Sequence, residues 1–194
     1  MTGKRLRLLI ADDESIRLLN LKAQLQGLGF EVVGEANDGV EAVDLATRLQ
    51  PDLVIMDIKM PNLDGIDAAK RLTAQNPLPI ILITAYGERE LAERASEAGI
   101  FGYLMKPVSE EDLLPAIVTA ISRFKEFQVL RQDLADLKDA LETRKLVEQA
   151  KGILMERLQL TEAEAFRRLQ QQSQRENKRM GEIARAIVTA SRLL

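Results

Sequence analysis

Residues 52–65, DLVIMDIKMPNLDG, carry the pattern that decides the fold. Four apolar residues, from Leu53 to Met56, lead directly into Asp57, and a Met-Pro pair and an Asp-Gly turn follow. A short apolar run without polar alternation is typical of a strand that is covered on both faces of a sheet. This stretch therefore predicts a buried strand that ends at Asp57 and passes into a turn.

Four further apolar runs have the same character, and amphipathic segments with helical spacing separate them. Strands that alternate with helices of this length indicate βαβ units. We therefore predict an α/β fold with a doubly wound, five-stranded parallel sheet of the flavodoxin type. The expected strands are 6–11, 31–35, 53–56, 80–83 and 101–105, and the expected helices are 15–28, 40–49, 65–75, 89–98 and one that begins at Ser109.

Polar residues follow the strands where they end. In an open parallel sheet these ends meet at one edge, which would bring together Asp12, Asp13, Asp57, Thr84 and Lys106. Two carboxylates 4 Å apart repel by about 4 kcal/mol at an effective dielectric constant near 20, and Mg²⁺, which prefers oxygen ligands, would relieve this repulsion. Each residue alone could be a helix cap, a turn residue or a solvated lysine. Together they favour a carboxylate that accepts a phosphoryl group beside a metal and a lysine.

The composition excludes several classes of catalyst. The 194 residues include no cysteine, histidine or tryptophan. Ser-His-Asp and Cys-His hydrolysis, zinc chemistry at thiolates or imidazoles, and phosphotransfer on a histidine of this chain are therefore ruled out. No run of about 18 apolar residues predicts a membrane span, and no signal-peptide pattern is present. We expect a cytoplasmic protein that does not contact a membrane.

The charge differs between two parts of the chain. Residues 1–120 hold 12 Lys and Arg against 19 Asp and Glu, whereas residues 121–194 hold 15 against 11. This asymmetry suggests two modules with different partners. The second part contains no carboxylate cluster, glycine-rich phosphate loop or nucleophile–base pair, so we do not expect an enzyme.

A heptad pattern connects the two modules. Apolar residues recur at alternating steps of three and four, which is the spacing of a coiled-coil seam. This pattern predicts a homodimer through the seam, but a helix that packs on its own chain would also explain it. The seam residues are Phe127, Leu130, Leu134, Leu137 and Leu141.

The remaining residues predict three short helices, at 144–158, from Thr161 to 175, and at 183–193. Thr161 and Glu164 have the spacing of a capping box, and we expect Asn177, Met180 and Gly181 to interrupt the helical pattern. The expected domains are 1–122, a linker helix at 123–143, and a small all-α domain at 144–194.

Residues 5–122 resemble the receiver domain of two-component response regulators. The motifs that carry the resemblance are IADDE at 10–14, the stretch 52–65, IILITA at 80–85 and YLMKP at 103–107. The resemblance implies a phosphoryl group that comes from a partner histidine kinase, a bound Mg²⁺, and a cis bond before Pro107. The residues it assigns are Asp57 as phosphoacceptor and metal ligand, Asp12, Asp13 and the Lys59 carbonyl as further metal ligands, Thr84 and Tyr103 as paired switch residues, and Lys106 as the phosphoryl-binding cation.

Residues 144–190 resemble the ANTAR domain, an RNA-binding antitermination module, through AKGILM at 150–155 and Glu-Ala-Phe at 164–166. The resemblance implies an RNA hairpin in a nascent transcript as the partner, held through basic and amide side chains. The residues we expect to contact RNA are Lys151, Arg175, Asn177, Lys178 and Arg179. The alternative is a DNA-binding response regulator, since LTEAEAFRRL and GEIARAIV superficially resemble a helix-turn-helix. Against it, the last helix is mostly apolar, whereas a groove-reading helix exposes polar residues.

Overall fold

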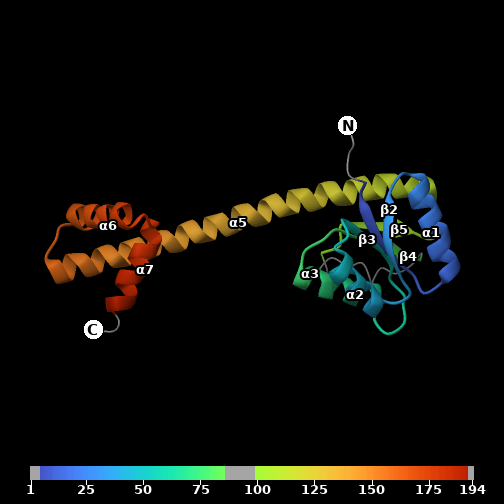
Figure 1. The fold of residues 1–194 in the computed structure, drawn as a ribbon, viewed down its shortest axis with the longest axis horizontal. Helices are drawn as coiled ribbons and strands as arrows, with labels where there is room; N and C mark the ends of the chain where they lie inside the picture. Colours follow the sequence, from blue (N-terminus) through green and yellow to red (C-terminus); the bar gives the residue numbers. More distant parts are fainter. Residues whose placement is uncertain (1–4, 86–98, 192–194) are drawn as a thin grey trace. The chain divides into compact units, whose positions relative to one another are not determined.

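The computed structural model describes residues 5–85 and 99–191. Its contacts divide the chain into two compact units, Met1–Phe127 and Gln128–Leu194, and Figure 1 shows both. The helix expected at 89–98 lies outside the described residues. None of the described helices has an apolar stretch long enough to cross a bilayer.

The first unit contains a five-stranded, fully parallel sheet with the strand order β2-β1-β3-β4-β5. This order confirms the predicted doubly wound fold. The observed strands lie within one residue of the predicted ends, because each is an apolar run buried between two layers of helices. The strands are β1 (Arg7–Ala11), β2 (Glu31–Ala36), β3 (Leu53–Asp57), β4 (Ile80–Thr84) and β5 (Gly102–Met105).

Helices cover both faces of this sheet (Figure 1). One face packs against α1 (Ser15–Gly27) and the first turns of α5 (Glu110–Leu158). The other face packs against α2 (Gly39–Leu49) and α3 (Gly65–Gln75). Each fully buried Leu or Ile contributes about 1.5–3 kcal/mol, so the two cores fix the sheet and, with it, the residues at its C-terminal edge.

Two glycines allow the turn after β3 to lie very close to neighbouring backbone atoms. A Cβ atom on Gly65 would lie 2.1 Å from the carbonyl oxygen of Asp57, and one on Gly39 would lie 2.2 Å from that of Leu63. Asn62, which has a left-handed backbone, donates an amide hydrogen bond to the Asp38 carboxylate at 2.7 Å. The close glycine contacts and the hydrogen bond between Asn62 and Asp38 together fix the turn, so the end of β3 has a defined position.

The second unit consists of the end of α5, α6 (Glu162–Glu176) and α7 (Met180–Ser191) around a small apolar core. The capping box at Thr161 and Glu164 is confirmed. The interruption before α7 is shorter than predicted, because Met180 and Gly181 lie inside the helix. There Gly181 packs against Thr143, within 3.0 Å of where its Cβ would lie, so the glycine allows close contact with α5 and does not end the helix.

Candidate metal centre and basic surface

Three carboxylates meet at the C-terminal edge of the sheet. Asp12 and Asp13 follow β1, and Asp57 ends β3, its neighbour in the sheet. One oxygen of each lies within 4.8 Å of the others. The strand order reverses between β1 and β3, and sites in open parallel sheets form at such a point. The predicted convergence of these three side chains is therefore observed.

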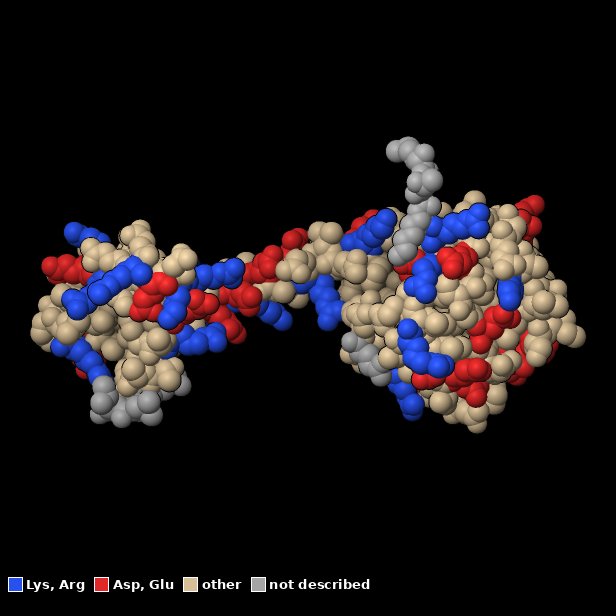
Figure 2. Space-filling model, in the orientation of Figure 1, with Lys and Arg blue, Asp and Glu red and all other residues tan. Residues whose placement is uncertain are grey.

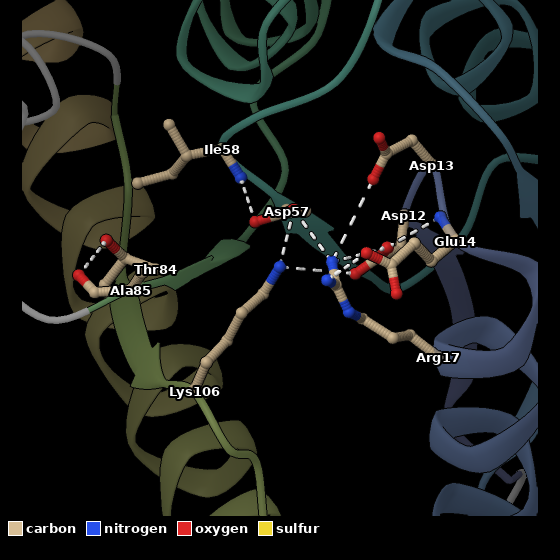
Figure 3. A network of polar contacts seen from close by, with 9 residues as sticks. All are labelled: Asp12, Asp13, Glu14, Arg17, Asp57, Ile58, Thr84, Ala85 and Lys106. Carbon is tan, nitrogen blue, oxygen red and sulfur yellow. Dashed lines mark hydrogen bonds and ion pairs between the residues drawn. The ribbon is translucent and has the colours of Figure 1, made fainter.

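Lys106, in the segment after β5, also reaches this cluster (Figure 3). Its ammonium group donates a hydrogen bond of 2.6 Å to Oδ2 of Asp57 and lies 3.7 Å from Oδ2 of Asp12. The bond between Lys106 and Pro107 is cis, as the resemblance implied. The lysine thus supplies a positive charge at the place where an added anion would lie.

Burial determines the ionisation of Asp57. Asp57 is 3% exposed and Asp12 is 2% exposed. Loss of solvation raises the pKa of Asp57 above its usual value, and the nearby Asp12 charge adds to this effect. The hydrogen bond and charge of Lys106, and the hydrogen bond that the Ile58 amide donates at 2.8 Å, lower the pKa and offset part of the rise. The ionised carboxylate is therefore disfavoured unless additional positive charge is present.

A residue that the sequence analysis did not select completes the cluster. Arg17, on α1, points its guanidinium group between the carboxylates (Figure 3). Its Nη1 atom lies 3.3 Å from Asp12, 4.0 Å from Asp13 and 3.8 Å from Asp57. The signal in the sequence was the i,i+4 spacing between Asp13 and Arg17, which places an ion pair at the start of the helix.

The other predicted residues of this site lie on β4, on β5 and in the turn after β3. Thr84 ends β4, and its hydroxyl donates a hydrogen bond of 3.2 Å to the carbonyl of Ala85. Tyr103 lies on β5, opposite Leu82, and partial burial raises its pKa. Lys59 is exposed in the turn after β3. The switch roles of Thr84 and Tyr103 and the metal contact of Lys59 stay predictions.

The predicted RNA-contacting residues fall into two groups. Arg175, Asn177, Lys178 and Arg179 are exposed at the connection between α6 and α7, where Asn177 ends α6 with a left-handed backbone. The Lys178 ammonium group donates to the Glu176 carboxylate at 2.8 Å. On the visible face of the second unit, basic side chains alternate with acidic ones (Figure 2). The local cluster at the α6–α7 connection is therefore a better candidate for an RNA-binding surface than the whole visible face.

Lys151 lies apart from this cluster. It is only 7% exposed, and its ammonium group donates to Glu162 at 2.7 Å and lies 2.9 Å from Glu148. Since Glu162 begins α6, Lys151 lies about 20 Å along that helix from Arg175, at 1.5 Å per residue. The pair with Glu162 attaches α6 to α5, whereas Glu148 lies on α5 itself. An RNA contact by Lys151 stays a prediction.

The site and the fold define a receiver: an α/β domain with an acidic pocket and a lysine at its sheet edge. The chain matches the response regulator receiver domain over residues 8–118 and the ANTAR domain over residues 135–188. It therefore belongs to the response regulators, in the group with a C-terminal ANTAR domain. This architecture fits a phosphorylation-dependent, RNA-binding antiterminator. The domain ends predicted from the sequence stay predictions.

Similar proteins support the same classification. The transcriptional regulatory protein PdtaR of Mycobacterium tuberculosis is 47% identical over 182 residues, which are 94% of this chain and 89% of that protein. A methylesterase/glutaminase of Myxococcus xanthus is 40% identical over 57% of this chain and 32% of its own length. Among solved structures, the receiver domain of a diguanylate cyclase from Desulfovibrio desulfuricans shares 39% identity, with a TM-score of 0.59 over 63% of this chain and 98% of that one.

The raised pKa of Asp57 predicts how substitution of this residue changes the thermal stability of the first unit. In EDTA at neutral pH, Asp57→Asn is expected to raise the thermal unfolding midpoint of the first unit. The folded-state pKa lies above the unfolded one, so folding is penalised above the folded-state pKa and the penalty disappears below the unfolded value. The gain should therefore shrink as the pH is lowered from about 7 to about 3.

Asp44→Asn is the control for this measurement. Asp44 is an exposed carboxylate that pairs with Arg48 at 2.7 Å on α2, and such pairs contribute little to stability. Differential scanning calorimetry across the pH range measures the unfolding midpoints of both variants. A lower midpoint for Asp57→Asn, or a gain that does not depend on pH, would contradict the assignment of Asp57 as a destabilised carboxylate.

Proposed function

We propose that this chain accepts a phosphoryl group on Asp57 from a histidine kinase and, in response, binds an RNA hairpin in a nascent transcript and prevents termination. The observation that carries the proposal is the contact of Lys106 with a buried Asp57 beside two further carboxylates, in a chain whose C-terminal residues match an ANTAR domain. The proposed location is the cytoplasm, because a histidine kinase donor and a nascent transcript would both be met there.

The residues at the sheet edge fit a Mg²⁺ ion. Asp12, Asp13 and Asp57 offer hard oxygen atoms close together, and burial, which raises the pKa of Asp57, disfavours its ionised form unless positive charge is added. We assign these three carboxylates and the backbone carbonyl of Lys59 as the protein ligands. When bound, the ion neutralises the oxygens of the transferring phosphoryl group.

The transfer needs only a nucleophile and charge balance. A carboxylate oxygen of Asp57 attacks the phosphorus of the donor phosphohistidine, the P–N bond breaks, and the imidazole leaves with its electron pair and takes up a proton. The Lys106 ammonium group then moves its hydrogen bond from the carboxylate to a phosphoryl oxygen, which disperses the added charge. Thr84 is proposed to donate its hydroxyl to another phosphoryl oxygen, and Tyr103 to turn inward with it.

This chemistry is not that of a dedicated enzyme. Related receiver domains occur within methylesterases, but here the residues after the receiver match an ANTAR domain. The proposed role is that of a phosphoacceptor with slow loss of its own phosphoryl group. No residue of this chain is assigned as a catalytic group acting on another substrate.

The heptad seam is proposed to form a homodimer. Its five apolar residues are 44–68% exposed, although Phe127 also contacts Phe101 with ring centroids 5.7 Å apart. A second copy of the same helix would bury the stripe through knobs-into-holes packing. Because α5 is continuous from the receiver to the second unit, the seam is the element that can report phosphorylation to the RNA-binding helices.

The acceptor assignment is tested by labelling. In Mg²⁺, Asp57→Asn should abolish incorporation of phosphate from a small phosphodonor, because an amide is not a nucleophile at phosphorus. Asp52→Asn provides the control, since Asp52 is the carboxylate that accepts the Arg7 amide at 2.9 Å before the same strand. Intact-mass spectrometry measures the added phosphoryl group, and persistent labelling of Asp57→Asn would show that another residue is the acceptor.

The RNA surface is tested by charge reversal. Lys178→Glu with Arg179→Glu should weaken binding to a hairpin RNA and reduce the slope of log K against log salt by about 1.5, as expected when two phosphate contacts are lost. Arg48→Glu with Lys70→Glu makes the same change in charge on the receiver unit and should leave the slope unchanged. Tighter binding to a matched DNA duplex than to RNA would favour the DNA-binding alternative.

Substitutions in the heptad seam test the proposed homodimer. Leu134→Lys with Leu137→Lys should abolish dimerisation, because each substitution places a charge in an apolar interface, whereas the exposed Ala135→Lys on the same helix should not. Sedimentation equilibrium with and without a phosphoryl mimic measures the mass. A wild-type chain that stays monomeric under both conditions would exclude the proposed seam contact.

A further inference from the structure

We infer that Arg17 is an internal competitor of the divalent cation: its guanidinium group holds the cation position among the three carboxylates and must leave before Mg²⁺ binds. The inference rests on the proposed function of this pocket as a magnesium site. It gives Arg17 a role in setting the Mg²⁺ concentration at which Asp57 becomes able to accept a phosphoryl group.

The geometry singles out one nitrogen atom. Nη1 of Arg17 lies within 4.0 Å of an oxygen of each of the three carboxylates, and Figure 3 shows the guanidinium group directed between them. Magnesium binds oxygen ligands at about 2.1 Å. An ion held by these carboxylates would therefore share the space that Nη1 fills, and the two positive charges would repel each other.

The position of Arg17 is not explained by helix stability. It is the third residue of α1, in the first turn, where the partial positive charge of the helix dipole disfavours a cation. Its side chain is 41% exposed, so it is not required to fill a core. The carboxylate partners are the interaction that compensates for this unfavourable placement.

The charges show why the arginine can be exchanged for a metal. Asp12, Asp13 and Asp57 carry three negative charges when ionised, and Lys106 supplies one positive charge. Arg17 supplies the second, which leaves a net charge of −1 in the pocket. A divalent ion brings two positive charges, so the charge of Arg17 is no longer needed once the ion is bound.

The surroundings allow Arg17 to leave. Its Nη2 atom also pairs with Glu14, which lies outside the three-carboxylate cluster and can keep the side chain paired after displacement. The pocket opens into a groove lined by Asn20 and Gln24 of α1 and by Pro107 and Val108. The long, partly exposed side chain therefore has open space beside it.

The test compares Mg²⁺ affinity, measured by isothermal titration calorimetry, in Arg17→Gln and Lys22→Gln. Lys22 is on the same helix and pairs with Glu35 at 2.6 Å, so its substitution removes one positive charge from α1 without touching the pocket. Arg17→Gln is expected to bind Mg²⁺ about 3- to 10-fold more tightly, because a competing ion pair of partial exposure is removed. Lys22→Gln should change the affinity by less than about twofold.

A second measurement follows from the same competition. In EDTA, Arg17→Gln should unfold at a lower temperature than the wild type, because the carboxylates lose a counter-ion. At saturating Mg²⁺ this difference should disappear. If Arg17→Gln does not fold in EDTA, the Nε–H of Arg17 in the wild-type chain is followed by NMR, and its exchange with water should accelerate at the Mg²⁺ concentration that fills the site.

The outcomes separate this inference from the proposed function. If Arg17→Gln binds Mg²⁺ with unchanged or weaker affinity, or if the exchange of the Nε–H does not respond to Mg²⁺, Arg17 is not a competitor. If Asp13→Asn leaves Mg²⁺ affinity unchanged in the wild-type background, the proposed metal site itself is wrong. The first result can occur while the second does not, so the two failures are distinguishable.

Discussion

The structure depends on the enforced proximity of like charges at one edge of the sheet. β1 and β3 are hydrogen-bonded neighbours; Asp12 directly follows β1 and Asp57 ends β3, and the cores on the two sheet faces prevent the strands from separating. The carboxylates can therefore reduce their repulsion only by gaining protons or cations. Burial is the main cause of the raised pKa of Asp57, and the nearby Asp12 charge adds to it, while Lys106 supplies part of the missing positive charge.

In the proposed function, the same constraint links phosphorylation of Asp57 to α5. A phosphoryl group adds about −1.5 to −2 charges to a pocket that is already short of positive charge. The Lys106 hydrogen bond must then be rearranged, and Lys106 follows β5 directly, while Phe101, just before β5, packs edge-to-face against Phe124 of α5 with ring centroids 5.2 Å apart. In the proposed function, the contact of Phe101 with Phe124 offers an apolar path from the segment around β5 to α5.

The sequence predicted the fold of the first unit well because its strands are buried on both faces, which makes them continuous apolar runs bounded by turn residues. It also predicted that Asp12, Asp13, Asp57 and Lys106 would meet, since strand order in this fold determines what lies at the edge. It could not predict the place of Arg17. A cation in a first helical turn can point to solvent or inward, and only the structure distinguishes the two.

In the second unit, too, the sequence alone did not show what a basic side chain contacts. From the sequence, Lys151 is one basic residue among several, and charge alone suggested a contact with RNA. In the structure its ion pair with Glu162 joins α5 to α6, and a second pair, with Glu148, lies within α5. Lys151 therefore contributes to holding the helices of this small unit together. The basic side chains proposed to contact RNA at the α6–α7 connection are exposed and do not join α5 to α6, so a contact there would leave the core of the unit intact.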